Sequence, residues 1–314
     1  MTWIIVIFVI LLGLIIFGIV MEKLNWNFTK LSIVRYETNS YEIIDNFIDI
    51  EIVSDTSDIE FVPSDNSNSL VVSYEDENMN HSVKVINNKL LIEVIDTRKW
   101  YEYIGINFDI PKITVFMPKG EYGKLVINSD TGDVTISNDF VFKSIDVSLS
   151  TGDVTNYASV FDSVKIKTST GDMNIENIAA NMLDFSTSTG RIDIINVNIF
   201  SDIKVDVSTG KTNIVDTNCK NIISSGDTGD MFMTNVIATE KFFIKRDTGD
   251  VRFKACDARD IFVKTDTGDV TGNFLTDKVI FAQSNTGNID VPKILANEKC
   301  EIITDTGDIR ITID

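Results

Sequence analysis

The C-terminal two-thirds of the chain repeats a Thr-Gly step at an almost constant spacing. Successive glycines of this series are 19 or 20 residues apart. They are Gly132, Gly152, Gly171, Gly190, Gly210, Gly229, Gly249, Gly268, Gly287 and Gly307. A fixed period of this length is typical of a solenoid or another repeat array. One repeating unit therefore builds most of the molecule.

Each unit has the alternation of a β-strand on both sides of its glycine. Apolar residues follow the glycine at the second and usually the fourth position, as in Val134 and Ile136. They also precede it by seven and five residues, as Ile145 and Val147 precede Gly152. This period-two pattern predicts short strands, and its change of phase at Thr-Gly-Asp predicts a corner. Glycine supplies the positive φ of such a corner, and the aspartate is expected to hydrogen-bond its own turn.

A unit of this size cannot bury its apolar residues alone, so neighbouring units must stack. We therefore predict an all-β protein, a β-solenoid of about ten 19–20-residue rungs. At about 4.8 Å per rung the rod would be about 50 Å long. Leucine-rich repeats fit worse, because the chain has neither an L-x-x-L-x-L line nor a helical segment between strands.

The region before the regular repeats is less uniform. The stretch EIVSDTSDIEF, residues 51–61, resembles a degenerate rung in which Ser57 takes the place of glycine. Several strand-like segments follow it, and we expect this region to cover the first rung, because an open solenoid end needs a cap. The predicted organisation is a transmembrane helix over residues 1–22, a juxtamembrane linker over 23–40, a capping β region over 41–120 and the solenoid over 121–314.

The N-terminal segment 3–21, from Trp3 to Met21, contains no charge and is long enough to cross a bilayer as a helix. It lacks the basic region and the small-residue cleavage site of a secretory signal, which favours an uncleaved single-pass anchor over a signal peptide. The cations Lys23, Lys30 and Arg35 that follow favour keeping this side inside the cell, although long domains are translocated largely regardless of charge.

The formal net charge is −19, from 47 acidic and 28 basic side chains. No basic stripe is present, so nucleic acid is excluded as a partner.

The residues that usually carry catalysis are scarce. His81 is the only histidine, lies in no catalytic motif and is predicted to be structural or exposed on a polar β turn. Cys219, Cys256 and Cys300 occupy apolar phases of the repeat and are predicted to be buried thiols. We therefore predict no catalytic residue, no cofactor and no enzyme activity, with a polysaccharide-active enzyme as a lesser alternative.

The repeat stacks carboxylates along one corner. In the rungs of Gly229, Gly249 and Gly268 these are Asp227, Asp230, Asp247, Asp250, Asp266 and Asp269. The simpler interpretation is that turn aspartates bind their own backbone in solvent. Repulsion between neighbours about 5 Å apart is only about 1 kcal/mol in water. The alternative is a ladder of weak calcium sites, because hard cations prefer several oxygen ligands.

An aromatic segment interrupts the capping region. RKWYEYIGINF, residues 98–108, contains Trp100, Tyr101 and Tyr103 beside an arginine. Such residues often anchor binding surfaces, which makes these three candidates for contact with a protein or glycan. The interpretation that we favour is that they plug the open end of the solenoid, with contact to a partner or glycan as the alternative.

Several of these motifs resemble the bacterial DUF4097 family. They are the degenerate first rung, NNKLLIEV at 87–94, ITVFMPKGEYGKLVINSDTGDVTI at 113–136 and the repeated Thr-Gly-Asp turns. The family is described as "putative adhesins" with a β-solenoid fold, often anchored in the membrane. The resemblance covers about residues 41–314 and implies a surface protein with the solenoid outside the cell.

The sequence is compatible with two classes of function. The first is a non-enzymatic envelope adhesin or scaffold, a rod that holds a binding surface away from the membrane. The second is an envelope-stress sensor or regulator that acts through membrane-protein partners of its helix or cap.

Overall fold

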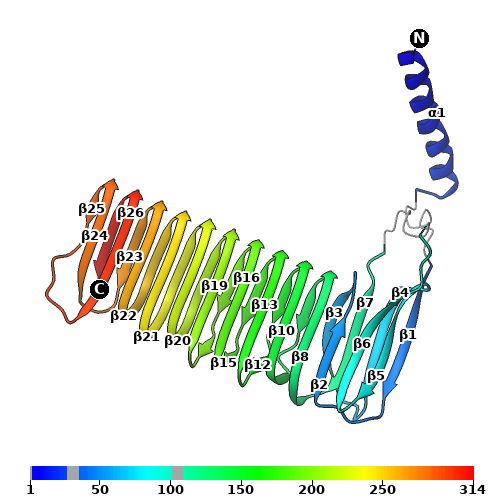
Figure 1. Ribbon diagram of the computed structural model, residues 1–314, viewed down its shortest axis with the longest axis horizontal. Helices are drawn as coiled ribbons and strands as arrows, with labels where there is room; N and C mark the ends of the chain where they lie inside the picture. The colour runs from blue at the N-terminus through cyan, green and yellow to red at the C-terminus, as the bar shows by residue number, and fades with distance from the viewer. Residues whose placement is uncertain (1, 27–34, 101–108) are drawn as a thin grey trace.

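The computed structural model describes residues 2–26, 35–100 and 109–314. In these described residues, one helix, α1 (Thr2–Lys23), is followed by strands, and the strands wind into a long rod (Figure 1). The predicted β-solenoid is confirmed.

Helix α1 precedes the first strand and stands at one end of the rod (Figure 1). Among the described residues it is the one helix long and apolar enough to cross a membrane. Its apolar side chains from Val6 onward are almost all exposed. A signal sequence near the N-terminus can also be long and apolar enough to meet this criterion.

The middle of the rod consists of rungs that wind around three faces. The first face holds most of β8 (Gly120–Thr131) and β10 (Phe140–Thr151), which both begin on the third face, together with β13 (Ser163–Thr170), β16 (Met182–Thr189) and β19 (Asp202–Thr209). The second holds β9 (Val134–Ile136), β11 (Val154–Asn156), β14 (Met173–Glu176) and β17 (Ile192–Ile195), and the third holds β12 (Ser159–Val160), β15 (Ala179–Ala180) and β18 (Asn198–Ile199). Later rungs bend without interruption in β20 (Thr212–Thr228), β21 (Met231–Thr248) and β22 (Val251–Thr267).

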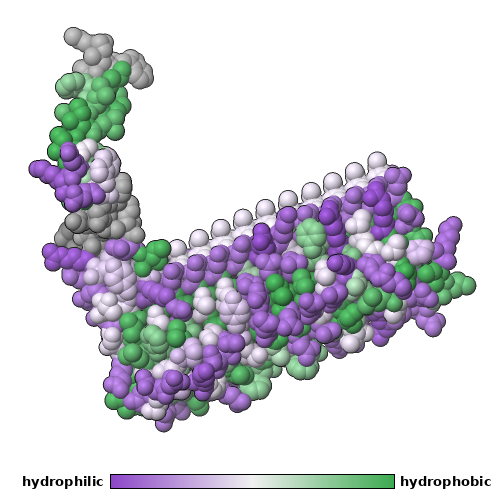
Figure 2. Space-filling model, turned by 180° about the vertical axis from the view of Figure 1, so that it is seen from behind, coloured by the Kyte–Doolittle hydropathy of each residue, from purple (hydrophilic) through white to green (hydrophobic). Residues whose placement is uncertain are grey.

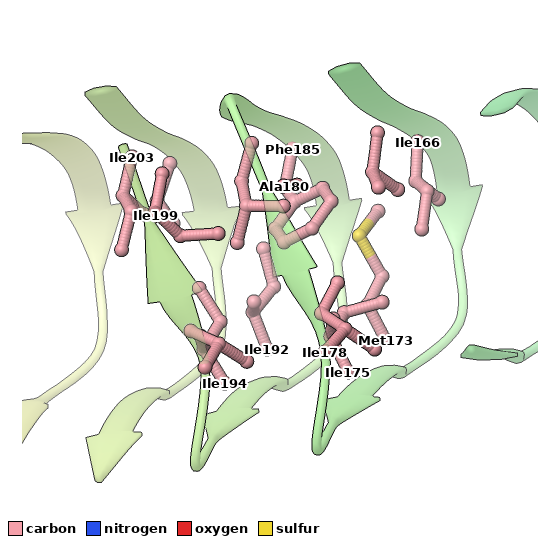
Figure 3. Packing of buried hydrophobic residues seen from close by; sticks show 14 of the residues in the cluster. Ile166, Met173, Ile175, Ile178, Ala180, Phe185, Ile192, Ile194, Ile199 and Ile203 are labelled. Atoms are coloured by element: carbon pink, nitrogen blue, oxygen red, sulfur yellow. The ribbon is translucent and has the colours of Figure 1, made fainter. Parts of the chain in front are cut away.

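Parallel, in-register pairing builds the core. Ile166 lies beside Phe185 on the next rung, and Phe185 lies beside Val205 on the one after. All three side chains are buried in one continuous apolar column, part of which Figure 3 shows. Burying such a side chain contributes about 1.5–3 kcal/mol, so the repeated inward positions stabilise each rung through its neighbours.

The first rung of the sequence is not the first rung in space. Strands β2 (Asp49–Val53) and β3 (Asp58–Ser64) form this rung. They pair in parallel with β8 and β9 on one side and with β6 (Lys89–Asp96) and β7 (Lys112–Pro118) on the other. The chain therefore inserts its first rung between two later ones.

Antiparallel strands cover the N-terminal end of the rod. Strand β5 (Met79–Ile86) pairs with β6, and β4 (Ser69–Asp76) pairs with β7 and with β1 (Tyr36–Ile43). Strand β1 thus starts at Tyr36, within the segment 23–40 that we assigned to the linker. Because these strands run antiparallel to their neighbours, they end the parallel stack and cover its edge at the N-terminal end of the rod.

The C-terminal end repeats the insertion. The last strands are β23 (Val270–Phe274), β24 (Lys278–Thr286), β25 (Ile289–Asp290), β26 (Glu298–Thr306) and β27 (Ile309–Ile313). Strand β26 pairs with β22 on one side and with β24 on the other. The final rung of the sequence is therefore the penultimate rung in space, and β24 with β25 forms the end of the rod (Figure 1).

Candidate functional site

The Thr-Gly corners stack into one continuous line. A Cβ atom on any of the ten glycines would lie 1.8–2.2 Å from a backbone carbonyl oxygen of the adjacent rung. Their φ angles also lie between 127° and 157°. Figure 2 shows evenly repeated pale residues along one long edge of the rod, as expected for corners that recur once in each rung. Glycine is required there both by the backbone conformation and by the close approach of the next rung.

Where an aspartate follows the corner glycine, its side chain accepts a hydrogen bond from the adjacent rung rather than from its own turn. The Oδ1 atom of Asp133 accepts the backbone N–H of Asp153 at 2.8 Å, and Oδ1 of Asp250 accepts that of Asp269 at 2.9 Å. Asp153, Asp172, Asp230, Asp269 and Asp308 accept in the same way. Our expectation of a bond within the turn was wrong at these positions, because stacking brings the neighbouring N–H closer to the carboxylate.

The six carboxylates of the candidate calcium ladder are partly paired with cations. Asp230 lies 3.7 Å from Lys211, Asp250 lies 2.8 Å from Arg252 and Asp266 lies 3.3 Å from Lys264. Asp227 and Asp247 are exposed. Within the described part of the chain, no three His, Cys, Asp or Glu side chains are grouped so as to hold a metal ion. Calcium binding remains a prediction.

In the five rungs from Gly171 to Gly249, a second corner uses a non-glycine residue with positive φ. Asn177, Asn196, Asp216, Asn235 and Ala255 have φ between 49° and 58° and stand six residues after their glycines. Asn196 donates to Asn177 at 2.6 Å, and Asn235 donates to Asp216 at 2.9 Å. None of our predictions included this second row of corners. The recurrence of Asn six residues after the corner glycine was a usable signal, since Asn tolerates this conformation.

The cap contains a buried chain of three polar side chains. Nδ1 of His81 lies 2.6 Å from Oε2 of Glu75, and Nε2 of His81 lies 3.2 Å from Oγ of Ser54. The backbone N–H of His81 and the Asn39 side chain also donate to Glu75. His81 is on strand β5 and buried, not on a polar turn as we predicted, because its strand faces the core of the cap.

The Glu75 carboxyl is held ionised by these contacts. Burial raises its pKa, but the hydrogen bonds from His81 and Asn39 and the charge of His81 outweigh burial. The pKa of Glu75 is therefore lower than that of an ordinary glutamate.

The order of serine, histidine and acid matches that of a hydrolytic triad. The serine, however, lacks the exposure that a nucleophile needs to reach a substrate. Ser54 borders a polar surface cavity of about 590 Å³ that Asp130 and Lys167 also line. The serine is only 7% exposed, however, and its hydroxyl is bonded to the buried imidazole. The three buried side chains connect the end of β2 with β4 and β5 through polar contacts.

The aromatic candidates are only partly described. Trp100 is 77% exposed at the end of the strand-like part of the cap. Tyr101 and Tyr103 lie outside the described residues. Contact of this segment with a partner remains a prediction.

The three cysteines are buried and reduced. Burial raises the pKa of the Cys219 and Cys300 thiols to about 12, so both stay protonated at neutral pH. Such thiols are poor nucleophiles.

The C-terminal end of the rod exposes apolar side chains beside a strand edge. In the described chain, β24 and β25 pair on one side only, with β26 and β27. A cavity of about 500 Å³ opens between β24 and residues 289–295, and its lining includes Ile280, Val291 and Leu295. Phe281 is 55% exposed and Leu295 is 98% exposed. Hydrophobic residues also gather at this end in Figure 2, at the opposite end of the rod from the helix.

The sequence matches the model of a known protein family. The model of the family described as Toastrack DUF4097 matches residues 47–210 and again residues 200–314. The chain belongs to the DUF4097 family. This assignment agrees with the motifs of the capping region and with the repeated Thr-Gly-Asp corners.

Three solved structures match most of this chain, at low sequence identity and with TM-scores below 0.5. A "putative adhesin" from Bacteroides fragilis is 16% identical, with a TM-score of 0.44 over 88% of this chain and 97% of that one. A "putative lipid binding protein" from Parabacteroides distasonis is 16% identical, with a TM-score of 0.47 over 90% and 98%. A "putative cell adhesion protein" from Clostridium sporogenes is 11% identical, with a TM-score of 0.24 over 90% and 100%. A search of curated proteins found no match.

Proposed function

We propose that this DUF4097 protein is a non-enzymatic envelope rod, held by α1 as a single-pass anchor, whose solenoid lies outside the cell and acts as an adhesin or surface scaffold. The observation that carries the proposal is the difference between the two ends of the rod. The helix and the antiparallel cap occupy one end, whereas the other end exposes an apolar cavity and a strand edge.

The open end suits contact with a partner. An exposed strand edge offers unpaired backbone N–H and C=O groups, which soluble proteins normally cover or protect by charge. Exposed apolar patches on a soluble surface often mark interaction sites. Because the rod holds this end far from the helix, an anchored molecule would present it away from the membrane.

The test compares the end of the rod with its side. Cells that express the full-length protein should adhere to a partner cell or glycan surface, and the double variant Phe281→Asp and Leu295→Asp should weaken adhesion about tenfold, as expected for loss of apolar anchors. The matched control is Phe161→Asp with Phe200→Asp, because both phenylalanines are exposed along the rod. Equal loss in both double variants would contradict a binding surface at the end.

Topology is tested separately. Protease added to intact protoplasts should digest the solenoid, and full protection would reverse its placement outside the cell. Crosslinking in intact cells followed by capture of the protein should recover envelope or surface partners. Recovery of membrane regulators bound to α1 or to the cap would instead support the sensor.

A further inference from the structure

A lysine amine and two carboxyl groups meet where the inserted rung joins the end of the rod. Nζ of Lys278 lies 2.6 Å from Oδ1 of Asp257 and 2.6 Å from Oε2 of Glu298. Oγ1 of Thr276 is 3.0 Å away. The lysine side chain is fully buried, whereas the side chains of Asp257 and Glu298 are 14% and 36% exposed.

The charges of this cluster do not balance. One ammonium faces two carboxylates, which leaves one negative charge in excess at a site that excludes water from the amine. A buried ion pair also pays a large desolvation cost, which conversion into a neutral group would remove.

From this geometry we propose that Lys278 and Asp257 are the site of an intramolecular isopeptide bond, with Glu298 as the acid–base group that assists its formation. The ion pair in the structure is the reactant state. The amine and the carboxyl are held within contact distance, and such fixed geometry raises the effective concentration of two reacting groups by orders of magnitude.

The step needs no other reactant. Glu298 accepts a proton from the Lys278 ammonium and passes it to the Asp257 carboxylate, which leaves a neutral amine and a neutral acid. Nζ then attacks Cγ of Asp257, and a second amine proton reaches the departing hydroxyl through Glu298. The Nζ–Cγ bond forms, a C–O bond breaks, one water leaves and Glu298 is again a carboxylate. No atom is oxidised or reduced.

Asp257 rather than Glu298 is assigned as the acyl partner because it is the more buried acid. The partial exposure of Glu298 gives it contact with solvent and gives the released water an exit. The bond would join β22 to β24 across the inserted strand β26. It would fix the outermost rung covalently to the body of the rod, independently of what the rod binds.

Mass spectrometry of the full-length protein in detergent tests the proposal. We expect an intact mass about 18 Da below that of the sequence, the mass of one water. After tryptic digestion, residues 255–259 should be joined to residues 265–293, which remain uncut after Lys278. An unmodified mass with normal cleavage after Lys278 would overturn the proposal, and a link between 265–293 and 294–299 would overturn the assignment of Asp257.

Variants separate chemistry from folding. Lys278→Arg keeps a cation but should retain the full sequence mass, and Glu298→Gln keeps the side-chain shape but should lose most of the modification. Lys299→Arg, an exposed neighbour on β26, is the matched control and should still be modified. Circular dichroism of each variant shows whether it has folded, and the wild-type mass decides the question even if Lys278→Arg does not fold. Full modification in Glu298→Gln would refute the role of Glu298.

Discussion

At the scale of single residues, the Thr-Gly-Asp corner is an inter-rung joint rather than an isolated turn. The glycine allows the backbone of the next rung to approach, and the aspartate accepts an N–H from that rung. Both residues therefore act on the neighbour, which explains why the motif recurs in step with the stacking.

We expect Gly249→Val to destabilise the protein by at least about 2 kcal/mol, because it combines an unfavourable φ with a steric clash. The φ of Gly249 is 146°, and a Cβ there would lie 2.2 Å from the carbonyl oxygen of Gly229. The free energy of unfolding in denaturant measures the effect. Gly120→Val is the control, since Gly120 has φ 158° but open space around it. Equal losses would show that the clash contributes nothing.

Replacing Asp230, Asp250 and Asp269 together by Asn should change stability little, because Asn keeps an oxygen that accepts the N–H of the next rung. Replacing them by Ala should cost about 0.5–1.5 kcal/mol for each lost hydrogen bond. The melting temperature without and with millimolar calcium is the readout. A rise in the wild type with calcium that disappears in the Asn variant would reveal a calcium ladder.

At the scale of structural elements, the rung of Gly249 has an unfavourable residue at the second corner that follows its glycine corner. Ala255 has φ 51° there, where other rungs have Asn or Asp. We expect Ala255→Gly to stabilise the protein by about 0.5–1 kcal/mol, because a positive φ is unfavourable for alanine but not for glycine. Ala258→Gly, on the same rung and buried, serves as the control and should destabilise. A loss of stability in Ala255→Gly would contradict the strain argument.

The cap should lose stability in acid through Glu75. The pKa of Glu75 is lower in the folded protein than the ordinary value of about 4.3. Ionised Glu75 therefore contributes fully to the free energy of unfolding above that pH, and this contribution disappears as the pH falls through the pKa of the folded state. The free energy of unfolding of Glu75→Gln should therefore depend less on pH below about 4.3 than that of the wild type. Parallel pH profiles would argue against this link.

At the scale of the whole molecule, both ends of the rod are built by insertion. The first rung of the sequence lies between the rung of β6 and β7 and the rung of β8 and β9. The last rung of the sequence lies between the rung of β22 and β23 and the rung of β24 and β25. Each inserted rung closes the sheet around segments that come from elsewhere in the chain. The ends are thereby tied to the body of the solenoid by strands that are distant in sequence.

Removal of residues 298–314 should consequently unfold more than one rung. Strand β24 pairs only with β26 in the described structure, so its amides at 278–286 should lose protection from hydrogen exchange together with the deleted strand. Amides of β20 and β21 should remain protected and provide the internal control. Retained protection at 278–286 would mean that β24 can pair directly with β22.

The sequence by itself determined the rung, its period, the glycine corner, the inward positions and the apolar helix, because each follows from a local pattern repeated along the chain. The tertiary structure alone decided the order of the rungs at the two ends. All rungs present nearly the same parallel edge, so local patterns do not specify which rung pairs with which. That choice placed His81 between Glu75 and Ser54 and brought Lys278 to Asp257 and Glu298, contacts between residues whose spacing in the sequence carries no motif.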